Sequence, residues 1–173
     1  MDRLEIVVWG DYTNPHTQEL DRRVRAALEG DEGARYSFRH YPLNSVCNPH
    51  FTRKDGSPTS CLASRAVEAA GRLGGTPAAW KMHDWLMETE SFTTNDIRRV
   101  ANSIGLDPTL HRTRMQDEDL DEIIAADARA ASQMGLASIP FVFVNDRRVP
   151  RWRHDKLPVI ETILEEARAE VGR

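Results

Sequence analysis

Long apolar runs are absent from this chain: no stretch approaches the roughly 18 residues that a membrane-spanning helix needs. Positive charge is not in excess, since the 173 residues carry a formal net charge of -4, which argues against a general nucleic-acid binder. Repeats and low-complexity segments are lacking too. Cysteine is limited to Cys47 and Cys61, which do not fix the redox compartment. What remains is an ordinary globular composition, long enough for one domain with a real core.

Residues 1–3 lead directly into a predicted short strand, so we expect no signal peptide within this sequence. We expect either a cytoplasmic protein or a trimmed piece of a longer exported or membrane-linked protein, which would be extracytoplasmic. The abrupt start at a core strand is compatible with trimming. The sequence indicates no oligomeric state.

A strand, a helix and a second strand are predicted near the start of the chain. Residues 4–9 are almost entirely apolar, which is typical of a strand buried on both faces. Asn14 is a favourable N-cap residue, and Pro15 suits the first position of the helix that follows. A second strand over about residues 35–41 comes after short connections, so we expect a right-handed parallel crossover.

The middle of the chain is predicted to be helical after one irregular stretch, residues 42–60. Loops of that length are usually functional or pinned. Hydrophobic periodicity and capping residues then predict a series of helices. They cover residues 61–73, begin at Thr76-Pro77, at Thr94 or Asn95 and at Asp107-Pro108, and end with a long helix over about 117–134.

The last part of the chain predicts two strands and a helix. Residues 141–144 form an apolar run, Asn145-Asp146 is a turn, and residues 147–150 form a short partner strand. An amphipathic helix follows, with apolar residues from Leu157 to Ala167. Periodicity alone therefore indicates an α/β protein with a helical subdomain.

Four segments resemble the DsbA-like branch of the thioredoxin superfamily, and they span nearly the whole chain. They are residues 9–12 with Pro15-His16, then 38–43, 80–84 and 135–145. The resemblance implies a single α/β domain over residues 1–173, a thioredoxin fold with a helical insertion. The thioredoxin core would occupy about residues 1–45 and 135–173, and the insertion about 59–134.

The family places its catalytic Cys-Pro-His-Cys motif where the first strand gives way to a helix. Here the same junction reads Asn14-Pro15-His16-Thr17. The family's chemistry needs a thiolate at a helix N-terminus and a second cysteine that resolves the mixed disulfide. An asparagine amide is no nucleophile, and a threonine hydroxyl cannot form a disulfide. The resemblance therefore predicts the fold more firmly than the activity.

The motif positions leave alternatives open. Asn14-Pro15 is either a plain helix cap or the remnant of the lost nucleophile, and both can hold. His16 is either a solvent-facing residue or, with Thr17, part of an anion-binding helix N-terminus. Ile139-Pro140 is expected to be cis, as the family's context implies. Together with His16, these two residues would then form a substrate-binding groove beside the motif.

Cys47 and Cys61 bracket the irregular loop and allow several interpretations. A structural disulfide would close about 15 residues and add roughly 3 kcal/mol in the chain-entropy model. A redox-active pair would replace the missing dithiol. Unlinked thiols are a third alternative, and a zinc site with His40 and His50 is a weak fourth, so no metal is expected.

A basic cluster surrounds Trp152. We interpret it as a solvated hairpin and helix start, which is favoured over a patch for an anionic partner. The cluster consists of Arg147, Arg148, Arg151, Arg153 and Lys156.

Three functions follow from these observations. The first is a non-catalytic or atypical member that binds a peptide or protein client at the Asn14–His16–Pro140 groove. The second is a thiol-disulfide oxidoreductase that uses Cys47 and Cys61. The third is a glutathione-dependent transferase or isomerase in which Thr17 or Asn14 orients the thiol. No cofactor is expected apart from glutathione in the third case.

Overall fold

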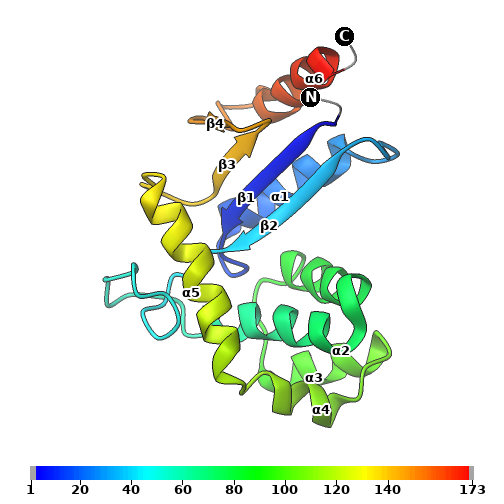
Figure 1. Ribbon diagram of the computed structural model, residues 1–173, viewed down its shortest axis with the longest axis vertical. Coiled ribbons are helices and arrows are strands. Elements are labelled where there is room, and N and C mark those ends of the chain that lie inside the picture. The colour runs from blue at the N-terminus through cyan, green and yellow to red at the C-terminus, as the bar shows by residue number, and fades with distance from the viewer. Residues whose placement is uncertain (1–2, 172–173) are drawn as a thin grey trace.

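A computed structural model describes residues 3–171 of the chain (Figure 1). Met1 and Asp2, the start of the segment expected to lead directly into a strand, lie outside the described residues. The elements are β1 (Glu5–Gly10), α1 (Pro15–Ala27), β2 (Arg35–His40), α2 (Ser60–Met87), α3 (Thr94–Ser103), α4 (Pro108–Arg114), α5 (Glu118–Gln133), β3 (Phe141–Val144), β4 (Arg147–Val149) and α6 (Val159–Val171).

The four strands form one mixed sheet in the order β2-β1-β3-β4. β1 pairs in parallel with β2, as the short strand-helix-strand connections predicted, and antiparallel with β3. Ile6 and Val8 of β1 are fully buried beneath α1 and α6, with Leu20 and Leu164 in the same apolar cluster. Trp9 belongs to another cluster with residues of α5, so both faces of the central strand are covered.

The helices α2 to α5 lie between β2 and β3 in the sequence; α2 to α4 gather beyond one end of the sheet, and α5 runs from them back toward β3 (Figure 1). They have their own apolar core, which includes Met82, Leu86, Ile97 and Leu120. Most of the alanines of α2 are buried in this core, which lets the neighbouring helices approach closely. The insertion therefore folds around a core distinct from the one under the sheet.

α2 changes direction at Gly75, where the backbone has φ 68° and ψ -170°. Positive φ suits glycine, and Pro77 then begins a new helical arm. The sequence predicted two separate helices here, and the structure joins them across this kink. The two arms of α2 consequently lie side by side, with Gly71 of the first arm close to Ala79 of the second.

The N-cap of α3 and the peptide bond before Pro140 are two further details of the fold. The helix α3 is capped by Thr93, not by Thr94 or Asn95: Thr93 accepts from the Asp96 amide, and the Asp96 side chain accepts from the Thr93 amide. This reciprocal capping box places the cap one residue earlier than expected. The Ile139-Pro140 peptide bond is cis, as predicted.

Candidate functional site

The motif turn, residues 14–17, forms a capped start for α1. The Asn14 side-chain oxygen accepts hydrogen bonds from the Thr17 amide at 2.9 Å and from the Thr17 hydroxyl at 3.3 Å. Pro15 occupies the first turn. The helix-cap interpretation of Asn14-Pro15 is thus confirmed, and the Asn14 side chain uses a backbone N–H that a thiolate would otherwise face.

Thr17 and His16 point into different environments. Thr17 is completely buried, and its hydroxyl also accepts from the Asp11 amide at 3.4 Å. A buried, bonded hydroxyl is poorly placed to orient the thiol of glutathione. His16 is exposed, and its Nε2 accepts from the Arg153 guanidinium at 3.4 Å, since arginine can only donate. The two side chains therefore do not share a ligand site.

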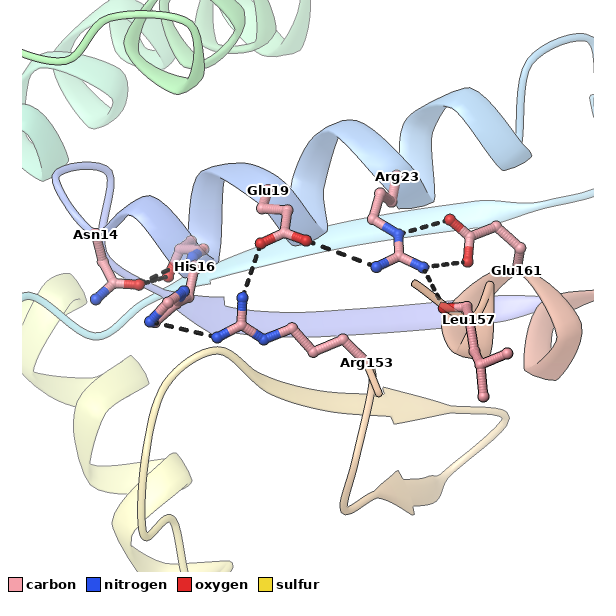
Figure 2. Close-up of polar contacts among 8 residues, drawn as sticks. Asn14, His16, Glu19, Arg23, Arg153, Leu157 and Glu161 are labelled. Carbon is pink, nitrogen blue, oxygen red and sulfur yellow. Dashed lines mark hydrogen bonds and ion pairs between the residues drawn. The ribbon is translucent and has the colours of Figure 1, made fainter. Parts of the chain in front are cut away.

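Polar contacts run along α1 from the motif turn to the C-terminal segment (Figure 2). Arg153 also pairs with Glu19 at 2.9 Å. Arg23 forms a two-point contact with Glu161 at 2.6 and 2.7 Å and also donates to the Leu157 carbonyl. Partly exposed pairs of this kind contribute little individually, about 0–1 kcal/mol. Together they link α1 to the C-terminal segment beside His16.

The basic cluster is partly neutralised within the molecule. Arg147 pairs with Glu170, and Arg153 pairs with Glu19. Arg148 lies over the Phe141 ring, and Arg153 also lies over the Trp152 ring. These contacts agree with the interpretation of the cluster as a solvated hairpin and helix start.

The cis-proline lies near the end of β1 that leads into the motif turn. Phe141, the residue after Pro140, pairs with Trp9 in the sheet. Ile139 and Pro140 are half-buried, and His16 is exposed. The topology therefore brings the two segments to the same end of the sheet, while a groove formed by Asn14, His16 and Pro140 stays a prediction.

Cys47 and Cys61 form a disulfide bond, with 5.8 Å between their Cα atoms. The interpretation as unlinked thiols is therefore wrong. The zinc interpretation is wrong as well, because each sulfur is bonded to the other. Residues 3–171 contain no group of three or more histidine, cysteine or acidic side chains placed to hold a metal ion. The disulfide joins the irregular loop to the first turn of α2.

The two cysteines differ in their local setting. Cys61 is the second residue of α2, whose N-cap residue, Thr59, makes no capping hydrogen bond with its side chain. Cys47 lies in a turn beside Val46, which is 74% exposed. Both cysteines are buried, at 3% and 5% exposure, and they pack against Ile124. Cys61 thus lies at a helix N-terminus, whereas Cys47 lies in the loop, next to the exposed Val46.

Asp11 connects the motif turn to the disulfide loop, and sequence reasoning missed it. One carboxylate oxygen accepts from the amide and hydroxyl of Thr13, at 2.7 and 2.8 Å. The other accepts from the Leu43 amide at 2.7 Å and from the Ser60 hydroxyl at 2.5 Å. Asp11 is 1% exposed. A signal was available, since an aspartate just after a buried strand often bonds nearby backbone amides.

A second buried polar cluster lies where β2 meets α2. The Tyr12 hydroxyl contacts His83 Nδ1 at 3.2 Å, and His83 Nε2 contacts Asp21 at 3.1 Å. The Tyr36 hydroxyl donates to the same Asp21 oxygen at 2.7 Å. Burial raises the pKa of Tyr12, and the carboxylates of Glu68 and Asp21 raise it further. Tyr12 therefore stays protonated and can donate to His83.

Residues 5–164 match the family described as the DSBA-like thioredoxin domain. Two curated relatives, the Na⁺/H⁺ antiporters NhaA 3 of Salinispora tropica and NhaA 1 of Salinispora arenicola, are each 31% identical over 144 residues. These residues make up 83% of this chain and 20% of each antiporter, so the chain spans about one fifth of these relatives. Within residues 3–171, no helix is both long and apolar enough to cross a membrane.

Solved structures with the same fold include BdbD from Bacillus subtilis, with a TM-score of 0.76 and 19% identity over 98% of this chain and 88% of that one. The thiol-disulfide oxidoreductase MdbA from Corynebacterium diphtheriae has a TM-score of 0.71 and 22% identity over 96% and 83%. The thiol-disulfide exchange protein α-DsbA2 from Wolbachia pipientis has a TM-score of 0.71 and 16% identity over 98% and 80%. These likenesses confirm the predicted thioredoxin fold with its helical insertion.

These findings correct the first functional hypothesis. The interpretation as a non-catalytic or atypical peptide-binding member is wrong, because it assumed that a chain without the motif cysteines has no disulfide chemistry. The chain has a bonded cysteine pair at Cys47 and Cys61, and the structural neighbours include thiol-disulfide oxidoreductases. A bonded pair is a two-electron couple, which is the reagent of thiol-disulfide exchange. The findings favour the alternative that uses these two cysteines.

Proposed function

The chain belongs to the DSBA-like thioredoxin domain family, and we propose that it is a thiol-disulfide oxidoreductase whose reactive disulfide is Cys47–Cys61. The single observation that carries the proposal is the bond between these cysteines. They are the only sulfur pair that this sequence offers for exchange. The substrates in this proposal are dithiols of proteins or peptides.

The exchange begins when a substrate thiolate attacks the Cys47 sulfur. A bond forms between the substrate sulfur and Cys47, and the bond to Cys61 breaks, so that Cys61 leaves as a thiolate. Its place in the first turn of α2 favours this, because a helix N-terminus stabilises negative charge. The side chain of Thr59 does not cap this helix, unlike Asn14 at α1.

The second step releases the oxidised substrate. Another thiolate of the substrate attacks the substrate sulfur that is bonded to Cys47, and Cys47 leaves as a thiolate that takes up a proton. Two substrate thiols have then become one disulfide, and the protein disulfide has become two thiols. Reoxidation is the reverse exchange with an oxidising disulfide, so electrons balance over the cycle.

Access to the disulfide requires movement of the loop, because both cysteines are buried. Hydrogen bonds from the Asn44 side chain (Nδ2) to the Ser57 carbonyl and from the Asn48 side chain (Nδ2) to the Pro42 carbonyl hold the loop closed, each at 2.9 Å. Local opening that breaks a few such bonds needs less free energy than global unfolding. In this proposal, exchange therefore takes place from an opened loop.

The test is the reduction potential of Cys47–Cys61. The protein is equilibrated in dithiothreitol and glutathione buffers, quenched with acid and alkylated, and its two states are counted by mass. We expect a potential in the range of about -270 to -120 mV that catalytic dithiols occupy. A potential below about -300 mV would mark a structural disulfide and contradict the proposal.

Activity provides the complementary measurement. Cys47→Ser and Cys61→Ser should each abolish oxidation of a fluorescent dithiol peptide. Ser45→Ala, on the exposed part of the same loop, is the matched control and should keep full activity. Equal activity in all three variants would place any oxidation outside this cysteine pair.

A further inference from the structure

One carboxylate oxygen joins the two ends of the irregular loop, residues 42–60. Asp11 Oδ2 accepts from the Leu43 amide near the start of the loop, at 2.7 Å, and from the Ser60 hydroxyl at its end, at 2.5 Å. The Ser57 amide also donates to the Leu43 carbonyl at 2.9 Å. Asp11, Leu43, Ser57 and Ser60 therefore form a closed neck, and the residues between Leu43 and Ser57 form the tip of the loop.

The neck is attached to the central strand of the sheet. Asp11 directly follows β1, and its own amide donates to the buried Thr17 hydroxyl at 3.4 Å. The second carboxylate oxygen accepts from the amide and the hydroxyl of Thr13, at 2.7 and 2.8 Å. With both oxygens engaged, the Asp11 side chain has a defined position, and the neck is fixed relative to β1.

The two cysteines lie on different sides of this neck. Cys47 belongs to the tip, next to Val46, which is 74% exposed. Cys61 lies beyond the neck, in the first turn of α2, and directly follows Ser60. Movement of the tip therefore displaces Cys47, whereas Cys61 keeps its place as long as the neck stays closed.

The bonds of the neck should outlast those of the tip. The neck bonds to Asp11 end on a carboxylate that is 1% exposed, and hydrogen bonds to an ionised acceptor are about twice as strong as neutral ones. The tip is held by neutral bonds: Asn48 donates from its side chain to the Pro42 carbonyl and from its amide to the Asn44 carbonyl. Opening of the loop therefore begins at the tip.

We propose that Asp11 is a positioning residue that determines which sulfur of the disulfide is attacked. It keeps Cys61 inside while the tip opens, so that an incoming thiolate meets Cys47. The substrate sulfur then bonds to Cys47, and Cys61 leaves as a thiolate that stays in place at the helix start. This role rests on the proposed oxidoreductase function, since it concerns the exchange at the same cysteine pair.

The experiment compares the alkylation of the two thiols in the reduced, folded protein. The intact chain is reduced with dithiothreitol, freed of the reductant without oxygen and mixed with iodoacetamide at neutral pH. Peptide masses over time give the rates at Cys47 and Cys61 separately. We expect Cys47 to react at least about tenfold faster than Cys61, because the neutral bonds break before the charge-assisted ones. Equal rates, or a faster reaction at Cys61, would overturn the proposal.

Two variants open the neck. Asp11→Asn removes the charge of the acceptor, whereas Ser60→Ala removes one neck bond and leaves the carboxylate in place. Each should speed alkylation of Cys61 by at least about tenfold and that of Cys47 much less. Ser57→Ala removes a hydroxyl of the same neck that lies 3.5 Å from the Thr59 hydroxyl, and this matched control should change neither rate. Ser60→Thr keeps the hydroxyl and should keep the slow rate at Cys61. Unchanged rates in both Asp11→Asn and Ser60→Ala would overturn the role of Asp11.

Urea separates opening of the neck from a general loss of stability. Alkylation through global unfolding speeds up steeply with urea, whereas alkylation through local opening hardly depends on it. Ile160→Val, fully buried in the cluster under the sheet, lowers stability away from the loop and should keep the slow rate at Cys61 without urea. Equal acceleration in Ile160→Val and Ser60→Ala would assign the protection of Cys61 to the whole fold and overturn the proposal. A reduction potential in the structural range would reject the oxidoreductase function, while the order of alkylation still decides the role of Asp11.

Discussion

The motif turn and the disulfide loop are two helix starts with opposite properties. At α1, Asn14 caps the helix with its side chain, and neither Asn14 nor Thr17 carries sulfur. At α2, the N-cap Thr59 makes no side-chain capping bond, and Cys61 lies one residue into the helix, bonded to Cys47. The comparison teaches that a favourable position at a helix N-terminus and a sulfur couple are separable properties. This chain keeps the family's motif turn at the start of α1, whereas its cysteine at a helix N-terminus, Cys61, lies at the start of α2.

The two helix starts are also physically connected. Asp11 accepts from Thr13, the residue before the motif turn, and from Ser60 at the start of α2, and Ser60 precedes Cys61. Thr13 and Ser60 are themselves 3.1 Å apart through their hydroxyl oxygens. The buried carboxylate of Asp11 therefore couples the loop to the segment that contains the motif turn.

The largest expected effect comes from returning sulfur to the motif turn. Asn14→Cys with Thr17→Cys, in a background of Cys47→Ser and Cys61→Ser, should restore dithiol oxidation from none to a readily measured rate. Thr17 lies against Gly10, where an added Cβ would come within 2.4 Å of the threonine methyl, and the smaller cysteine fits the same space. The measurement is oxidation of a fluorescent dithiol peptide.

The control for this variant is Asn14→Cys alone in the same background, which has no resolving partner and should stay inactive. If the double replacement forms no disulfide, the position at α1 has been lost together with its sulfur, and the comparison between the two helix starts breaks down.

Removal of the loop disulfide should have the next largest effect. The bond closes a loop with a sequence separation of 14 residues. In the chain-entropy model, such a loop contributes about 3 kcal/mol to the free energy of unfolding. Urea unfolding of the Cys47→Ser/Cys61→Ser protein should show this loss. The unaltered protein in dithiothreitol is the control and should lose a similar amount; a loss below about 1 kcal/mol would argue that the reduced loop keeps its contacts.

Asp11→Asn should lower the free energy of unfolding by about 2 kcal/mol, since hydrogen bonds to a buried charged group are the strong ones. Thr13 donates to one oxygen of Asp11, and Leu43 and Ser60 donate to the other. Asparagine has only one acceptor oxygen, so one of these two sets of donors would lose its acceptor. Urea unfolding at neutral pH gives the value. Asp155→Asn is an exposed control and should leave stability unchanged. No loss in Asp11→Asn would mean that the two helix starts are held independently.

Much of the fold could be predicted from the sequence, because each local signal agreed with its neighbours. The apolar run before residue 10, the Asn14-Pro15 pair and the glycines after helices gave the elements, and the resemblance gave their arrangement. The site was harder. The Cys47–Cys61 bond depends on loop geometry that no periodicity encodes. Asp11 accepts hydrogen bonds from Leu43 and Ser60, which are 32 and 49 residues away along the chain. The predicted N-cap of α3 was wrong by one residue, because Thr93, Thr94 and Asn95 are all favourable N-cap residues.

The smallest predicted effect tests the asymmetry between the two helix starts directly. Asn14→Ala removes an accepted hydrogen bond from the Thr17 amide and should cost about 1 kcal/mol, whereas Thr59→Ala removes no capping bond and should cost only a few tenths. Both are measured by urea unfolding of the oxidised protein, with Asn102→Ala on the exposed face of α3 as the reference. Equal losses for the two caps would contradict the asymmetry. In that case the amides at the start of α2 would already be engaged, and the stabilisation that the proposed Cys61 thiolate needs would have to come from elsewhere.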